Sequence, residues 1–349
     1  MTSAASRIPD RIELARDPGE PLVDAFKRRI TYLRLSVTDR CDLRCSYCMP
    51  ERMTFLPRRE VLTLEELHEV AAAFIARGVR KIRITGGEPL VRRGITKLFS
   101  TLGRELGRGL DELTLTANAT QLAAHADALA ASGVERVNVS LDTLSHARFE
   151  RLTRRDALPQ VLEGIEAAGR AGMRVKLNVV ALRDVNEDEL PALVEWAHDR
   201  GHDVTFIEVM PLGDVEHDRL DHFLPLDTLR ESLSRRWTLT PSDHDTGGPA
   251  RYYRVGETGG RIGFITPHTD NFCAGCNRIR VTATGALYPC LGGGERVDLR
   301  TALRGSNPAG DLAAALDQAM TIKPERHRFE MDRRGAAPAL DRHMSVTGG

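Results

Sequence analysis

The stretch that decides the fold is Leu33-Arg34-Leu35-Ser36-Val37-Thr38-Asp39-Arg40-Cys41. Apolar and polar residues alternate along it, which is typical of a β-strand with two different faces. A cysteine ends the stretch, and two more follow in the spacing Cys41-x3-Cys45-x2-Cys48. The segment therefore predicts a strand whose carboxyl end leads into a loop with three thiols.

Five further segments share this strand pattern and are separated by helical patterns. The expected strands begin near Ile30, Arg80, Glu112, Arg136, Met173 and Asp203. After the first strand, Thr63 and Glu66 form a capping box for a helix that Gly78 ends. Alternating strands and helices are typical of a parallel α/β sheet, and six units predict a partial (β/α)6 barrel of the TIM type. We expect an N-terminal arm at 1–29, the barrel at 30–211 and a C-terminal region at 212–349.

The same alternation predicts what lines the barrel. The apolar faces must cover the surrounding helices, so the polar faces point inward and carry Arg34, Lys81, Arg83 and Lys176. Buried cations are costly unless water or an anion meets them. We therefore expect a chamber for a polyanion such as a phosphorylated nucleotide. An antiparallel sheet with one solvated face is the alternative that the pattern leaves open.

Length and charge narrow the class of protein. The chain has 349 residues, with 49 basic against 49 acidic side chains, and this balance argues against a general nucleic-acid binder. At ~150 residues per domain, the length suggests about two domains. The longest apolar run, Val70–Ala76, is far too short to span a membrane. The first 29 residues carry no apolar leader, so we expect a cytoplasmic protein with no membrane partner.

The six cysteines form two triplets, which are Cys41, Cys45 and Cys48, and Cys273, Cys276 and Cys290. Disulfides are rare in the reducing cytosol, and thiolates in threes suit iron–sulfur clusters. A [4Fe–4S] cluster on three cysteines leaves one iron open for another ligand. Zinc with a borrowed His or Asp, and unliganded thiols, are the alternatives. Arg278 and Arg280 follow the second triplet, on one side of an expected strand.

A glycine pair lies in the loop after the second strand, in Thr85-Gly86-Gly87-Glu88-Pro89. Glycines allow the backbone to approach a ligand closely. Loops that follow barrel strands are where such folds place their chemistry. The pair alone is a weak motif, and its position makes it a candidate part of the site.

Together these motifs resemble the radical S-adenosylmethionine (SAM) superfamily and, within it, the GTP 3′,8-cyclase family of molybdenum-cofactor biosynthesis. The resemblance runs from about Tyr32 to the end of the chain. Besides residues 33–41, it is carried by IRITGGEPL at 82–90, NVSLD at 138–142, FIEVMP at 206–211, FCAGCNR at 272–278 and the terminal Gly348-Gly349.

The resemblance implies roles for individual residues. It implies two [4Fe–4S] clusters, one on each cysteine triplet. It implies that SAM contacts Tyr47, Gly87, Ser140 and Met210. It implies that GTP contacts Arg34, Lys81, Arg83, Thr116, Lys176, Arg278 and Arg280. It also implies that Gly348 and Gly349 belong to the catalytic centre, because the family's tail reaches into the chamber. The residues alone predict a frayed end there.

The implied activity is that of a radical SAM lyase. An electron enters the first cluster, SAM is cleaved to methionine and a 5′-deoxyadenosyl radical, and that radical removes the 3′ hydrogen of GTP. Attack on C8 then gives (8S)-3′,8-cyclo-7,8-dihydroguanosine 5′-triphosphate, while the second cluster orients the base. The implied partners are a reductant of the flavodoxin or ferredoxin type and a downstream cyclic pyranopterin monophosphate synthase. The resemblance also admits a homodimer.

Two departures from the family pattern leave alternatives open. Thr205 stands where the family commonly has an arginine, which removes a positive charge from the substrate site. Ala119 stands where a glycine is usual, which stiffens or shifts its loop. The alternatives are a twin-cluster radical SAM enzyme that acts on another substrate, such as a peptide, and an inactive metal-binding paralogue.

Overall fold

The computed structural model describes residues 19–213, 215, 220–269, 272–327, 329, 340 and 342–348. Within them the named strands form one 12-stranded sheet of order β12-β11-β10-β1-β2-β3-β4-β5-β6-β9-β8-β7. The strands are β1 (Tyr32–Ser36), β2 (Lys81–Thr85), β3 (Glu112–Ala117), β4 (Arg136–Ser140), β5 (Arg174–Val180), β6 (Asp203–Ile207), β7 (Leu239–Ser242), β8 (Arg251–Val255), β9 (Arg261–Ile265), β10 (Arg278–Val281), β11 (Ala286–Tyr288) and β12 (Val297–Asp298).

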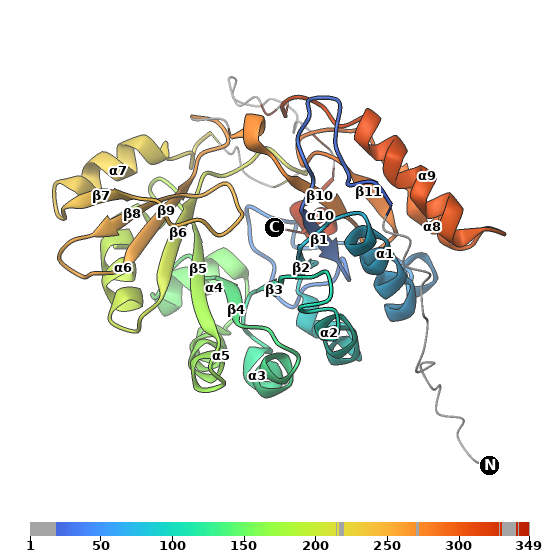
Figure 1. The fold of residues 1–349 in the computed structure, drawn as a ribbon. Coiled ribbons are helices and arrows are strands. Elements are labelled where there is room, and N and C mark those ends of the chain that lie inside the picture. Colours follow the sequence, from blue (N-terminus) through green and yellow to red (C-terminus); the bar gives the residue numbers. More distant parts are fainter. Residues whose placement is uncertain are drawn as a thin grey trace, which may run out of the picture.

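Strands β10, β1 to β6 and β9 all run parallel to one another, so the antiparallel alternative is wrong. The sheet curves into an open arc, with α1, α2, α3, α5 and α6 on its outer side (Figure 1). The helices are α1 (Leu64–Ala76), α2 (Ile95–Gly103), α3 (Leu122–Ala131), α4 (His146–Thr153), α5 (Leu158–Arg170), α6 (Leu190–His198), α7 (Leu226–Ser234), α8 (Leu299–Leu303), α9 (Pro308–Thr321) and α10 (Met344–Thr347). The expected partial barrel is therefore confirmed. None of the described helices is long and apolar enough to cross a membrane.

The first βα unit shows why the sequence pattern worked. The apolar side chains Leu33, Leu35 and Val37 are fully buried in the core that the helices cover. The capping box of α1 is present, since Thr63 accepts a hydrogen bond from the Glu66 amide (3.1 Å) and the Glu66 carboxylate accepts one from Thr63 (2.7 Å). Gly78 follows the helix with a φ of 90°, which is a left-handed conformation that glycine adopts without strain.

Strands from the C-terminal region complete the sheet at both ends. Strand β9 pairs with β6, and β10 pairs with β1 in a register that puts Arg278 opposite Tyr32 and Arg280 opposite Arg34. The division of the chain at residue 211 stays a prediction. Of the expected arm, residues 1–18 lie outside the described residues, while Leu22 is buried and its amide donates to the Arg77 carbonyl (3.1 Å).

Ala119, in the loop between β3 and α3, gives a prediction about stability. It is buried and has a φ of 67°, a left-handed conformation that costs an L-residue roughly 1–2 kcal/mol. We expect Ala119→Gly to raise the free energy of unfolding by about 0.5–1 kcal/mol, because glycine removes the backbone strain. Part of that stabilisation is offset, because glycine gives the unfolded chain more conformational entropy. Urea denaturation measures the change. Ala124→Gly, on the exposed face of α3, is the control and should lower stability by about 1 kcal/mol. If Ala119→Gly were no more stable than the unmodified protein, the inference that Ala119 is strained would be wrong.

Candidate active site

The carboxyl ends of the strands open into a first cavity beside the first cysteine triplet. It gathers all three thiols, the glycine pair of the loop after β2, and every residue expected to contact SAM. The predicted residues that line it are Cys41, Cys45, Cys48, Tyr47, Gly87, Thr116, Ser140 and Met210. Residues far apart in sequence therefore meet at one end of the barrel, as the strand pattern predicted.

The first triplet has the chemistry that an iron–sulfur cluster requires. All three cysteines are free thiols and partly exposed to the cavity. Burial raises the pKa of the Cys45 thiol well above its usual value, and the neighbouring Cys48 and Cys41 raise it further. Three thiols that oppose each other's ionisation are stabilised as thiolates when a metal centre shares their charge. Among the described residues, no group of three or more His, Cys, Asp or Glu side chains is placed to hold a single metal ion.

The glycine pair packs directly against the cysteine loop. A Cβ at Gly86 would lie 2.6 Å from the Thr38 carbonyl oxygen, and one at Gly87 would overlap the Arg40 carbonyl. The Gly87 amide donates to the Thr38 carbonyl (2.8 Å). Only glycine allows this approach, so the two loops form one cradle at the cavity wall.

Two polar contacts, which the sequence did not indicate, hold the cysteine loop in place. Asn118 donates to Asp42 (2.7 Å) and lies 3.7 Å from the Cys41 sulfur. The Tyr47 hydroxyl donates to Asp142 (2.5 Å), whose pKa burial raises to about 6. These contacts fix the loop from the residues that follow β3 and β4.

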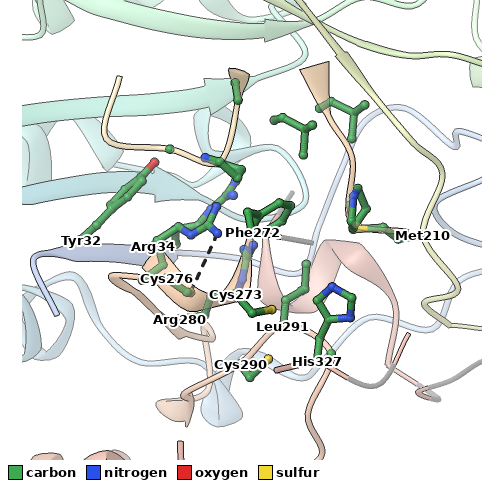
Figure 2. A pocket seen from close by; sticks show the side chains of 18 of the residues that line it. Tyr32, Arg34, Met210, Phe272, Cys273, Cys276, Arg280, Cys290, Leu291 and His327 are labelled. Atoms are coloured by element: carbon green, nitrogen blue, oxygen red, sulfur yellow. Dashed lines mark hydrogen bonds between the residues drawn. The ribbon is translucent and has the colours of Figure 1, made fainter. Parts of the chain in front are cut away.

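A second cavity adjoins the first and contains the other triplet. Figure 2 shows Cys273, Cys276 and Cys290 gathered on one side of it, with Tyr32 and Arg34 facing them. The predicted residues that line it are Arg34, Arg83, Lys176, Met210, Arg278, Arg280, Cys273, Cys276 and Cys290. The two cavities lie next to each other, because four residues line both: Asn178, Ile207, Met210 and Met344.

The thiols of the second triplet come from two segments that the sheet brings together. Cys273 and Cys276 bracket a short 3-10 turn before β10, and Cys290 follows β11. Burial alone would raise the pKa of Cys276, but the Arg278 guanidinium and the Lys323 ammonium outweigh it and lower the pKa to about 7. A thiol that ionises near neutral pH fits a ligand to iron.

Within the part of the chain that the structure describes, no carboxylate forms an ion pair with Arg34, Arg83 or Lys176. Burial and the neighbouring Arg280 hold the pKa of Arg34 well below its ordinary value, and burial with Arg83 does the same for Lys176. The Nε atoms of Arg34 and Arg83 are buried and have no hydrogen-bond partner among the described residues. Such a cluster becomes favourable when a polyanion binds between the cations.

Two predicted contact residues, Lys81 and Thr116, and the departure Thr205 are not among the residues that line the second cavity. The Lys81 ammonium forms an ion pair with Glu112 (2.6 Å) and donates to the Thr246 carbonyl. Thr116 lines the first cavity. Thr205, the departure on β6, is fully buried, and a Cβ added to the neighbouring Gly263 would contact both Thr205 and the Tyr252 ring.

The C-terminal tail enters the barrel. Gly348 is buried, and Arg280 donates to its carbonyl (2.6 Å). Helix α10 lies on the inner side of the sheet near β1 (Figure 1). The frayed end that the residues alone predicted is therefore wrong for Gly348, while Gly349 lies outside the described residues.

Two tyrosines near the buried cations were not predicted: Tyr32, which lines the second cavity, and Tyr252, which contacts Lys176. The Tyr32 hydroxyl is buried without a hydrogen-bond partner among the described residues, and Lys81 and Arg83 lie over its ring at 4.9 and 5.5 Å. The Tyr252 hydroxyl accepts from the Lys176 ammonium (3.1 Å). The alternation of β1 does put Tyr32 on the face of Arg34, so that signal was available. Tyr252 comes from β8, whose place in the sheet the pattern did not predict.

Two family profiles and several known structures match this chain. The profile of the radical SAM superfamily matches residues 35–223, and that of Molybdenum Cofactor Synthesis C matches residues 202–329. Structures of similar fold include Streptococcus suis SuiB bound to S-adenosylmethionine (TM-score 0.55, 17% identity, 80% of this chain and 62% of that one). Another is native anSMEcpe with bound AdoMet (TM-score 0.54, 15% identity, 81% and 83%).

The open barrel with a cysteine triplet and a glycine cradle at its carboxyl end defines a radical SAM protein. Much more similar sequences are the GTP 3′,8-cyclase of Erythrobacter litoralis (67% identity, 94% of this chain and 98% of that one) and that of Rhizobium etli strain CIAT 652 (57%, 94% and 94%). This chain belongs to the GTP 3′,8-cyclase family of the radical SAM superfamily.

Proposed function

We propose that this chain is a GTP 3′,8-cyclase, which joins C3′ and C8 of GTP in molybdenum-cofactor biosynthesis. The observation that carries the proposal is the set of cations that line the second cavity: Arg34, Arg83, Lys176 and Arg280, which are buried, and the half-buried Arg278. They favour a polyanion over a peptide, which disfavours the alternative of a peptide-modifying enzyme. The two relatives at 67% and 57% identity carry this function in their names and support the proposal.

The two cavities divide the work. When bound, a [4Fe–4S] cluster on Cys41, Cys45 and Cys48 together with SAM supplies the radical chemistry of the reaction. The cations of the second cavity hold the triphosphate, and its cysteine triplet would hold the second cluster at the base end of the nucleotide. Because Met210 and Asn178 line both cavities, the two cavities adjoin, and SAM and GTP bound in them would lie next to each other. The protein thus contributes to catalysis chiefly by positioning SAM and GTP.

Equilibrium binding of nucleotides tests the polyanion site. We expect anaerobic calorimetry on the reconstituted enzyme to rank GTP above GDP and GDP above guanosine, because each phosphate meets additional buried cations. The difference should shrink when Arg34 is changed to Met. Equal affinity for GTP and guanosine would contradict the proposed site.

Tyr32→Phe should weaken GTP binding by about tenfold to a hundredfold, because a hydrogen bond to a charged group is worth about 1.5–3 kcal/mol. Burial would raise the pKa of Tyr32, but Arg83 and Arg34 outweigh it and lower the pKa, so the phenol lies in a strongly cationic environment. The substitution keeps the ring beneath Lys81 and Arg83 and removes only the donor. The expected readout is a higher KM for GTP with kcat little changed.

Tyr253→Phe is the matched control for this experiment. Tyr253 lies on β8, which is several strands away from β1 in the sheet, and its hydroxyl accepts from Arg230 (2.8 Å). The KM of the Tyr253→Phe variant for GTP should equal that of the unmodified enzyme. Equal KM values for Tyr32→Phe and Tyr253→Phe would show that the Tyr32 hydroxyl donates no hydrogen bond to the phosphates of GTP.

Three further partners follow from family membership. We propose a reductant of the flavodoxin or ferredoxin type, a downstream cyclic pyranopterin monophosphate synthase that takes the cyclised nucleotide, and a homodimer. Family membership supports all three.

A further inference from the structure

The second cysteine triplet has a buried cation, Lys323, beside it. Resting on the proposed cluster ligands, we infer that Lys323 is a positioning residue for the second triplet and that its charge raises the reduction potential of the cluster held there. Lys323 follows α9 and is only 3% exposed. Neither the cysteine spacing nor the strand pattern pointed to it.

The contacts of Lys323 account for all the donors that an ammonium has. Its Nζ donates to the Pro289 carbonyl (2.7 Å) and to the Arg278 carbonyl (3.0 Å), and it lies 3.8 Å from the Cys276 sulfur. An ammonium has three N–H donors, so each has an acceptor. The side chain is therefore held in one orientation, with its charge against a ligand sulfur.

The two carbonyls belong to the two segments that carry the thiols. Pro289 immediately precedes Cys290, and Arg278 is the second residue after Cys276. The Lys323 ammonium thus ties the segment of Cys276 to the segment of Cys290. Holding both segments sets the separation of the thiols before a cluster is assembled, which is the usual task of groups around a metal site.

The charge of Lys323 also acts on the redox state. Reduction adds a negative charge to a cluster, and a nearby positive charge stabilises the reduced form. Net charge, hydrogen bonds to the sulfurs and solvent exposure set the potentials of such clusters. A buried charge is little screened by salt, so its effect is close to its full strength.

A second cation near the triplet serves as a comparison. Arg28 donates to the Cys273 carbonyl (2.9 Å), so it also holds a ligand loop. Its charge, however, is neutralised by an ion pair with Asp24 (2.6 Å). Arg28 thus shares the tethering role with Lys323 and lacks the uncompensated charge.

The test is a redox titration of the second cluster, followed by electron paramagnetic resonance. It uses the full chain with Cys41, Cys45 and Cys48 changed to Ser, so that only the second cluster contributes a signal. Into this background go Lys323→Gln, which keeps an amide donor without the charge, Lys323→Met, and as the control the double variant Asp24→Asn/Arg28→Met, which removes a neutral ion pair. We expect both Lys323 variants to shift the midpoint potential to more negative values and the double variant to leave it unchanged.

The iron content separates the possible failures. An unchanged potential in Lys323→Gln and Lys323→Met at full iron content would overturn the inference. Failure of both variants to take up iron, with native circular dichroism, would support the positioning role, because the ligand segments would then come apart in an otherwise folded chain. Cys276→Ala in the same background should lose the remaining irons, about four. If it keeps them, the proposed ligand set is wrong, which is a different result from a failure of Lys323.

Discussion

Cys45→Ala is expected to reduce the release of 5′-deoxyadenosine to the background of the assay. It should also remove about four of the about eight irons that two four-iron clusters contain. Cys45 lies between Cys41 and Cys48 in one loop, and its thiol is the one that both neighbours influence. Without it, two cysteines remain, and neither the glycine cradle nor Asn118 offers a soft ligand to replace it. Iron analysis and product chromatography measure the two effects.

Cys276→Ala is the matched control, since it should remove a similar amount of iron from the other site. The proposed roles of the two cavities predict that this variant still binds SAM. It should lack the second cluster, which is proposed to orient the base of GTP. A Cys45→Ala protein with full iron content and normal release of 5′-deoxyadenosine would show that the first triplet is not the ligand set.

Gly348→Ala is expected to lower formation of the cyclised nucleotide by roughly a hundredfold, the size of effect that a small misplacement of reacting groups can have. Gly348 has a φ of 74°, and an added Cβ would overlap the Thr85 hydroxyl at the end of β2. The tail would have to move, and with it the carbonyl that Arg280 holds at 2.6 Å. Iron content should stay normal, because no cysteine lies in the tail.

Two variants separate the overlap from the backbone strain. Gly172→Ala introduces the same methyl group at a φ of 83° in open space, and it should leave turnover unchanged. Adding Thr85→Gly to Gly348→Ala removes both the hydroxyl and the Cβ that the new methyl group would overlap, and it should restore part of the activity. Normal turnover in Gly348→Ala alone would show that the tail has no part in the site.

Much of the barrel could be predicted because its strands have two different faces. The alternation in β1 and β2 indicated both the strand positions and an inward-facing set of cations, and Arg34, Arg83 and Lys176 do line one cavity. The parallel sheet followed from the helices between strands. The capping box at Thr63 located the first helix to within a residue.

The rest depended on contacts that no local pattern contains. Strand β10 lies beside β1 although the two are more than two hundred residues apart, and this pairing puts Arg280 next to Arg34. Likewise, Lys323 meets Cys276 only because α9 folds back over the end of the sheet. The roles of the predicted contact residues stay predictions, which the variants above test.

The most direct test of the central claim is the dependence of SAM cleavage on GTP. Anaerobic enzyme reconstituted with iron and sulfide receives SAM and a strong reductant, with or without GTP, and the products are identified by mass spectrometry. The account predicts GTP-dependent release of 5′-deoxyadenosine together with a nucleotide of the mass of GTP that has a C3′–C8 bond. Release that is the same without GTP, with GTP recovered unchanged, would contradict it.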